Sequence, residues 1–169
     1  IKVPFLVSHP GVIPMDNVQS TMASAYDVLP TLLDYLGLPL PNTNLPGQSL
    51  LPALKGGRIN DRDSVVIYDE YGYCRMIRTA EWKYVDRHPD GPHELYDVVN
   101  DPDDRDNLID DPAHVDRVED LKKKMETWFQ QYVIPDMDGR MYNVAGYGQL
   151  RPVGAKWEDG HAPFDGAAK

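Results

Sequence analysis

Four short strand-like segments follow one another between residues 64 and 98, and they constrain the fold more than any other feature. They read SVVIYDE from residue 64, CRMIRT from residue 74, WKYVDR from residue 82 and ELYDV from residue 94. Turn-forming residues separate them, with Gly72 in the first break and Pro89-Asp90-Gly91-Pro92 in the last. Consecutive short strands with short links predict a four-stranded antiparallel meander.

A long amphipathic helix is predicted directly after these strands, over residues 112–132. Asp111 is a suitable N-cap, and Pro112 suits the first helical turn. Apolar side chains recur at three- and four-residue steps along this segment: Val115, Val118, Leu121, Met125, Trp128, Phe129 and Tyr132. The pattern predicts one helical face packed across the sheet, with Trp128 and Phe129 in its buried stripe. The fold class is therefore α+β.

The first part of the chain has a different pattern. Residues 3–8 form an almost uniformly apolar run, which is typical of a strand covered on both faces. Residues 27–37 read as a helix with Asp27 as N-cap and Gly37 at its end. Its apolar stripe consists of Leu29, Leu32, Leu33 and Leu36. A shorter helix is predicted over residues 49–54.

Charge and composition exclude several classes of function. The formal net charge is −10, which argues against binding to nucleic acid or to an anionic membrane surface. The sequence contains no apolar run long enough for a membrane span. Cys74 is the single cysteine, so neither an intrachain disulfide nor a zinc-type cysteine cluster is predicted.

The five histidines are the other candidates for chemistry: His9, His88, His93, His114 and His161. None of them shows the spacing of a helical metal site, and no metal role is predicted for them. His88 and His93 flank the Pro-Asp-Gly-Pro turn and could face one another across it. They are the predicted substrate contacts, with ordinary loop histidines as the alternative.

The acidic run after the last strand resembles a calcium loop only superficially. Counted from Asp101, the fifth, sixth and twelfth positions, where an EF-hand needs a ligand, a glycine and a glutamate, hold Arg105, Asp106 and Pro112. We therefore interpret this run as a solvated turn whose carboxylates suit the N-terminus of the following helix.

Five segments, taken in order, resemble the sulfatase family of the alkaline phosphatase-like superfamily. They are VPFLVSHPGVIP, YDVLPTLLDYLGLPLP, GQSLLPALKG, MIRTAEWKYV and ELYDVVNDPDDRDNL, and they span about 110 residues. The resemblance implies a large α/β domain followed by a small C-terminal domain with a four-stranded sheet and one helix. It also implies hydrolysis of sulfate esters by a formylglycine nucleophile beside a calcium ion, acting on a sulfated small molecule or carbohydrate.

The family's nucleophile and metal-ligand motifs lie upstream of the segments that match. No catalytic residue and no metal ligand is therefore carried over to this chain, and calcium and formylglycine are expected only in a longer protein. Two pentapeptides half-match the Cys/Ser-x-Pro-x-Arg site of formylglycine formation. The segment from Cys74 to Arg78 has methionine in place of proline, and the segment from Ser8 to Val12 has valine in place of arginine. Both are interpreted as chance matches.

These observations predict three parts: residues 1–60 end the large α/β domain, residues 61–134 form the small domain, and residues 135–169 are an irregular tail. The chain begins inside an apolar run, so we expect the C-terminal piece of a longer protein, or a product of propeptide processing. Two alternatives stay open: a phosphonate or phosphate monoester hydrolase of the same superfamily, and a non-catalytic binding or oligomerisation module. For the chain alone, residues 3–8 are expected either to self-associate with a second copy or to fold back onto the chain's own helices, and a disordered first ten residues is the alternative. The resemblance is compatible with export.

Overall fold

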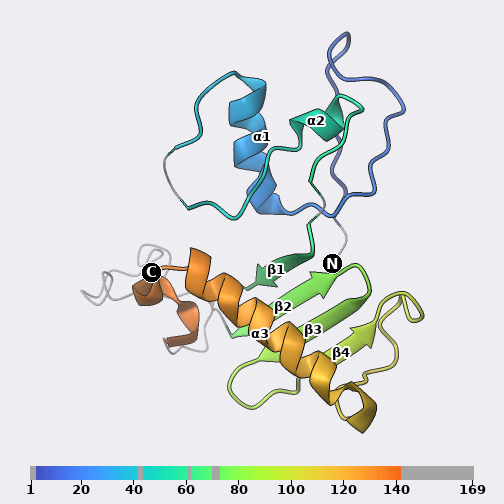
Figure 1. Ribbon diagram of the computed structural model, residues 1–169, viewed down its shortest axis with the longest axis vertical. Helices are drawn as coiled ribbons and strands as arrows, with labels where there is room; N and C mark the ends of the chain where they lie inside the picture. Colours follow the sequence, from blue (N-terminus) through green and yellow to red (C-terminus); the bar gives the residue numbers. More distant parts are fainter. Residues whose placement is uncertain (1–2, 42–43, 61, 70–72, 142–169) are drawn as a thin grey trace, which may run out of the picture. The chain divides into compact units, whose positions relative to one another are not determined.

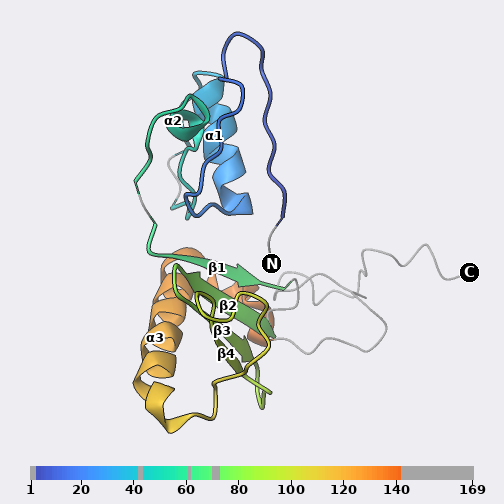
Figure 2. The same cartoon turned by 90° about the vertical axis from the view of Figure 1, so that its right-hand side faces the viewer.

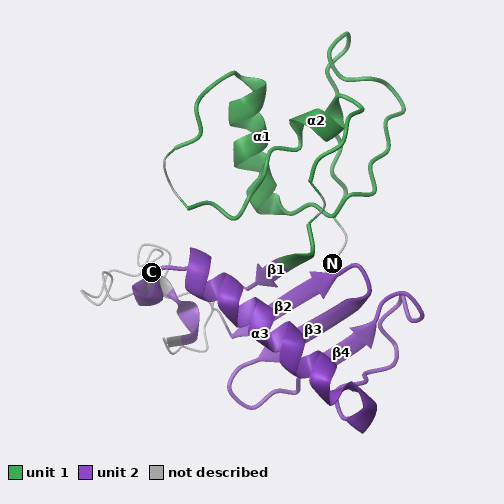
Figure 3. Cartoon of the chain, in the orientation of Figure 1, with its two compact units in different colours: residues 1–65 green, residues 66–169 purple. Residues whose placement is uncertain are grey.

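The computed structural model describes residues 3–41, 44–60, 62–69 and 73–141 (Figure 1). The chain divides into two compact units, residues 1–65 and residues 66–169 (Figure 3), and each is described by itself. The helices of the first unit are η1 (Ala25–Asp27), α1 (Val28–Tyr35) and α2 (Leu51–Leu54). The strands are β1 (Ser64–Tyr68), β2 (Cys74–Thr79), β3 (Trp82–Arg87) and β4 (Glu94–Asp97). The later helices are η2 (Pro112–His114), α3 (Val115–Tyr132), η3 (Pro135–Met137) and η4 (Gly139–Met141).

The predicted meander is confirmed. The strands lie side by side in the order β1-β2-β3-β4, so each strand neighbours the next one along the chain. In the antiparallel pairs, Ile77 of β2 lies opposite Tyr84 of β3, and Tyr84 lies opposite Leu95 of β4. This register brings core-facing side chains of neighbouring strands into line.

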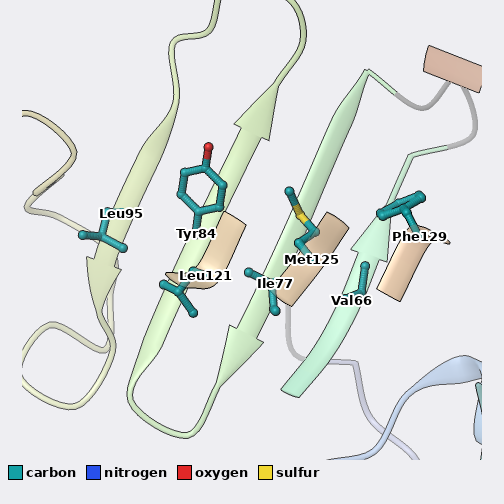
Figure 4. Close-up of a cluster of buried hydrophobic side chains, with 7 residues drawn as sticks. All are labelled: Val66, Ile77, Tyr84, Leu95, Leu121, Met125 and Phe129. Carbon is teal, nitrogen blue, oxygen red and sulfur yellow. The ribbon is translucent and has the colours of Figure 1, made fainter. Parts of the chain in front are cut away.

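The core of the small unit lies between the sheet and α3, which crosses one face of the sheet (Figures 1 and 2). Each strand contributes one buried side chain and α3 contributes three (Figure 4): Val66, Ile77, Tyr84, Leu95, Leu121, Met125 and Phe129. The predicted stripe is thus correct for its central members. Trp128 is only partly buried, and Val115 is 50% exposed.

The start of α3 agrees with the sequence pattern. The Asp111 carboxylate accepts a hydrogen bond from the backbone N–H of Ala113, 2.9 Å away, and so caps the turn that precedes the helix. Pro112 occupies the first position of that turn. No described helix is long and apolar enough to cross a membrane.

The segment after β4 is fastened to the strand by its own side chains. Asn107 Oδ1 accepts from the backbone N–H of Leu95 at 2.9 Å, and Asn107 Nδ2 donates to the carbonyl of His93 at 3.2 Å. The Leu108 N–H donates to the carbonyl of Leu95 at 2.8 Å. Asn107 and Leu108 therefore occupy backbone groups at the outer edge of β4.

We expect Asn107→Ala to lower the free energy of unfolding by about 1–3 kcal/mol, because it leaves the N–H of Leu95 unpaired at a fully buried position. Urea denaturation followed by circular dichroism measures this loss. Asn107→Asp is the matched control, because it keeps the oxygen that accepts from Leu95 and replaces the amide that donates to His93 with a charged oxygen. If Asn107→Ala is as stable as Asn107→Asp, the Asn107 side chain does not satisfy the N–H of Leu95.

In the first unit, Asp27 lies at the N-cap of α1, and its carboxylate also binds groups from two other segments. Asp27 is completely buried. It accepts hydrogen bonds from the backbone N–H of Ser24 at 2.7 Å and of Gln48 at 2.9 Å. Arg62 donates to both carboxylate oxygens, through Nη1 at 2.9 Å and Nη2 at 2.6 Å. The carboxylate thus joins η1, the segment before α2 and the segment before β1.

Two further residues fix α1 to the segment that leads into α2. The Thr31 hydroxyl donates to the carbonyl of Asp27 at 2.6 Å and accepts from the N–H of Leu50 at 2.9 Å. Gly47 packs so close that a Cβ at its position would collide with the carbonyl of Tyr26. At the other end of α1, Gly37 adopts φ +66°, as predicted for a helix-ending glycine.

The prediction of a strand over residues 3–8 is wrong for the described chain. These residues form no strand, and Val3 and Leu6 are 77% and 92% exposed. A strand exists only by pairing, and none of the described segments pairs with this one. The stripe of α1 shows the same pattern, because Leu29, Leu32 and Leu36 are all exposed.

Candidate functional site

The two predicted substrate contacts lie at one end of the small sheet, in the loop between β3 and β4. His88 directly follows β3, its backbone N–H donates to the carbonyl of Tyr73 at 2.8 Å, and its ring stacks on the Tyr73 ring at a centroid distance of 6.3 Å. His93 directly precedes β4, and its ring lies 6.5 Å from that of Tyr84. Each imidazole therefore has a partner of its own, and the two do not pair with one another as the sequence had suggested.

His93 belongs to a polar cluster centred on Asp86. The Asp86 side chain is only 10% exposed. Its Oδ1 lies 3.2 Å from His93 Nδ1 and 3.4 Å from the Tyr84 hydroxyl, and its Oδ2 accepts from Arg140. Burial, together with the charge of Asp86, raises the pKa of the Tyr84 hydroxyl, so this group stays protonated and can donate.

A second ion pair lies beside this one. Arg75 lies directly opposite Asp86 in the register of β2 and β3, is 3% exposed, and pairs with Asp138. Its guanidinium lies 3.7 Å from the centroid of the Phe129 ring. Burial lowers the pKa of the Arg75 guanidinium, and so does the nearby charge of Arg140.

These contacts correct the prediction of an irregular tail for residues 135–141. This segment forms η3 and η4 and pairs two of its charged residues with the sheet. The rest of the predicted tail, residues 142–169, lies outside the described residues. Sequence reasoning missed the cluster, although one signal was present. In WKYVDR, Asp86 shares the alternating face of Trp82 and Tyr84, and an acid on a core-facing position requires a partner.

Cys74 does not have the surroundings of an activated nucleophile. It is the first residue of β2, and burial raises the pKa of its thiol. The neighbouring Arg87 opposes this shift but does not reverse it. Arg87 is itself engaged with the Glu94 carboxylate and the carbonyl of Pro92.

The acidic residues after β4 are occupied by the backbone of their own loop. Asp97 accepts from the N–H groups of Val99 and Asn100, and Asp101 accepts from those of Arg105 and Asp106. Asp104 pairs with Lys83 of β3. Within the described residues, no group of three or more His, Cys, Asp or Glu side chains could hold a metal ion. In the part of the chain that the structure describes, the residues therefore do not fit a calcium ion.

The pKa of the Asp97 carboxyl is held below its ordinary value, chiefly by the hydrogen bond from the Asn100 side chain and then by the Asn100 backbone N–H. We expect Asn100→Ala to raise this pKa toward the ordinary value. A depressed pKa contributes stability that is fully present above the ordinary value, about pH 4, and is lost as pH falls through the depressed value. Asn100→Ala should therefore remove this contribution above about pH 4 and weaken the pH dependence of stability below it. Carbon-detected NMR titration measures the pKa of the Asp97 carboxyl in both chains. An unchanged pKa would show that the Asn100 side-chain amide is not a hydrogen-bond partner in solution.

The two histidines form a polar surface above the buried ion pairs of the sheet. His88 is exposed and His93 is partly exposed, while the buried charges beneath them are paired. Imidazole groups at such a surface can exchange hydrogen bonds with a polar ligand. Among the described residues around them, no side chain is arranged as a nucleophile with its base.

A family model described as "N-sulphoglucosamine sulphohydrolase, C-terminal" matches residues 1–131. Arylsulfatase K of Rattus norvegicus is 37% identical over 121 residues, covering 63% of this chain and 21% of the relative. A Delta 4,5-hexuronate-2-O-sulfatase of Bacteroides thetaiotaomicron is 34% identical over 126 residues, covering 67% of this chain and 25% of the relative. The chain thus spans about a fifth to a quarter of the length of these relatives.

A solved structure of similar fold is the phosphonate monoester hydrolase of Agrobacterium radiobacter. It is 28% identical, with a TM-score of 0.56, and the match covers 67% of this chain and 26% of that one. The small sheet with its long helix is therefore an architecture shared with relatives that act on different esters.

Proposed function

The chain belongs to the N-sulphoglucosamine sulphohydrolase C-terminal family, a sulfatase family, and from this membership we propose that it is the C-terminal part of an enzyme that hydrolyses sulfate esters. The observation that carries the proposal is the family match over residues 1–131, which includes residues of both compact units. The matching curated relatives are sulfatases several times longer than the chain.

In this proposal the chemistry is performed outside the 169 residues. Cys74 lies in a strand with a thiol of raised pKa, and the acidic loop after β4 is occupied by backbone N–H groups. Neither provides a nucleophile or a metal site. The formylglycine and calcium of the family would belong to the remainder of the protein. The contribution of this chain is support, together with substrate contacts from His88 and His93.

Residues 1–60 are proposed to complete the large α/β domain of that longer protein. The extended run at residues 3–8 and the stripe of α1 expose apolar side chains that would gain burial there, including Leu6, Leu29 and Leu32. In the isolated chain these same side chains favour self-association. Sedimentation at two concentrations, with Leu6→Asp as the comparison, tests this: association that the charged variant leaves unchanged would locate the contact elsewhere.

The substrate class proposed is a sulfated carbohydrate, since a relative at 34% identity is a hexuronate 2-O-sulfatase. A phosphonate monoester hydrolase is the second candidate, because a protein of that activity shares the fold at 28% identity. A module without catalytic function is the third.

Two assays separate these candidates. The longer protein should cleave 4-nitrophenyl sulfate and sulfated disaccharides faster than a phenyl phosphonate monoester, and the reverse order would favour the second candidate. A longer protein inactive on all three would favour the third. The chain alone should release no product from any of them, with or without calcium. Turnover by the chain that Cys74→Ala abolishes would overturn the assignment of chemistry to the remainder.

A further inference from the structure

Three parts of the small unit meet at the carboxylate of Asp86. Tyr84 lies on the same strand, His93 lies in the loop before β4, and Arg140 belongs to η4. Arg140 contacts Oδ2, whereas His93 and Tyr84 face Oδ1. The position of Oδ1 therefore depends on a segment more than fifty residues away in the sequence.

The ring nitrogen of His93 that faces Asp86 has two competing partners. Nδ1 lies 3.2 Å from Asp86 Oδ1, and the backbone N–H of Arg87 points at the same atom from 3.3 Å. A ring nitrogen either carries a proton and donates or lacks one and accepts, so it cannot satisfy both groups. Donation to a carboxylate is charge-assisted and stronger than acceptance from an amide. An unprotonated Nδ1 would also direct its lone pair at a negative oxygen. The proton is therefore best placed on Nδ1.

The arginine that holds Asp86 is itself fixed from the other side. The backbone N–H of Arg140 donates to Asp138 Oδ1 at 3.0 Å, and Asp138 pairs with the buried Arg75. Arg75 is held against the ring of Phe129 on α3. Residues 138–140, which we call the strap, thus attach to two buried and oppositely charged positions of the sheet.

We propose that the strap holds Asp86 so that it accepts the Nδ1 proton of His93, which makes Asp86 and Arg140 positioning residues for this imidazole. In the neutral ring Nε2 then carries a lone pair and accepts hydrogen bonds. His93 is thereby suited to accept from a sugar hydroxyl rather than to donate to a sulfate oxygen. Only this last step rests on the proposed function, since the hydrogen-bond state of His93 follows from the geometry of the chain alone.

The first test is NMR of the full 169-residue chain at a pH where His93 is neutral. Long-range proton–nitrogen spectra show which ring nitrogen of each histidine carries the proton. We expect Nδ1–H for His93 in the unchanged chain. Arg140→Gln should move the population toward Nε2–H, and Arg140→Lys should restore the original state. Arg105→Gln is the matched control, because Arg105 forms an ion pair with both side chains exposed, at 78% and 65%.

Amide exchange gives a second readout. When Nδ1 loses its proton it can accept from the Arg87 N–H, so Arg140→Gln should slow exchange at Arg87 while speeding it at Arg140, each by about tenfold for one hydrogen bond. His114, whose ring lies 5.1 Å from that of Trp82, is the internal reference for an intact fold. Nε2–H in the unchanged chain, or Nδ1–H retained in a folded Arg140→Gln variant, would overturn the proposal. If that variant does not fold, Asp138→Asn loosens the strap without removing the partner of Asp86, and the same two criteria apply.

The substrate step has its own experiment in the longer enzyme. Arg140→Gln should raise KM for a sulfated disaccharide by about tenfold, the factor for one lost hydrogen bond, and leave kcat unchanged. If the proton on His93 moves as expected but KM stays constant, the substrate role of His93 fails while its positioning by the strap stands.

Discussion

Phe129→Ala should lower the free energy of unfolding of the small unit by about 3–5 kcal/mol, the range for removing a buried phenyl ring from a packed core. Phe129 is 7% exposed and packs in the cluster between α3 and the sheet. Its ring also carries the guanidinium of Arg75, so the substitution removes a cation–π contact as well as burial. Urea denaturation followed by circular dichroism at 222 nm measures the change.

Two variants on the same helix calibrate this result. Val115→Ala changes a side chain that is 50% exposed and should cost less than about 1 kcal/mol. Trp128→Ala should fall between the two, because Trp128 is only partly buried. If Phe129→Ala costs no more than Val115→Ala, α3 is not docked on the sheet as described.

Asp27→Asn should destabilise the first unit by about 3–5 kcal/mol, because it leaves the guanidinium of Arg62 without its charged partner. The Asp27 side chain is completely buried and that of Arg62 is 12% exposed, so water can replace little of the lost pairing. An asparagine also offers one acceptor where the carboxylate serves four donors. Amide exchange at Ser24 and Gln48 gives the local readout.

The matched control is Arg105→Gln, which breaks an exposed ion pair and should cost less than about 1 kcal/mol. A second comparison replaces both partners, with Asp27→Leu and Arg62→Met in one chain. Since a buried ion pair often contributes little beyond apolar packing, the double variant should recover most of the stability lost in Asp27→Asn. Unaltered exchange at Gln48 in Asp27→Asn would show that the carboxylate does not hold this segment.

The sheet and α3 could be predicted from the sequence because their signals are local. Short strand-like segments bounded by turn residues and a three-to-four-residue apolar repeat are both local patterns, and the structure contains the strands and the helix that they predict. The same signals failed for residues 3–8. An apolar run indicates that a segment is stable only when other residues bury it. It does not indicate whether those residues belong to the same 169-residue chain.

The polar cluster around Asp86 shows the opposite limit. Its partners are Tyr84 and His93, nearby in the chain, and Arg140, which no local pattern connects to β3. Pairing over such a separation depends on the whole fold. Asp86 lies two residues after Tyr84 on the same face of β3, and this position indicated a buried acid. Only the structure identifies Arg140 as the group that neutralises it.

The acidic loop after β4 also shows why composition alone misleads. Its carboxylates have the density of a cation site, yet Asp97 and Asp101 are consumed by backbone N–H groups and Asp104 by Lys83. A carboxylate next to unpaired backbone N–H groups accepts hydrogen bonds from them and is then not free to bind a metal ion.

The bonds from Asn107, Leu108 and Asp101 to β4 also determine how molecules of this kind can meet. They occupy the N–H and C=O of Leu95 and the carbonyl of Asp97, which are the groups that a foreign strand would need in order to add to the sheet. Side-by-side stacking of sheets from separate molecules is therefore blocked at this edge by the chain's own loop. While Asn107 is in place, the protein should accordingly form no intermolecular sheet through β4, even when it is crowded or partly unfolded. Fibrillar association that begins at this strand requires the loop to detach first.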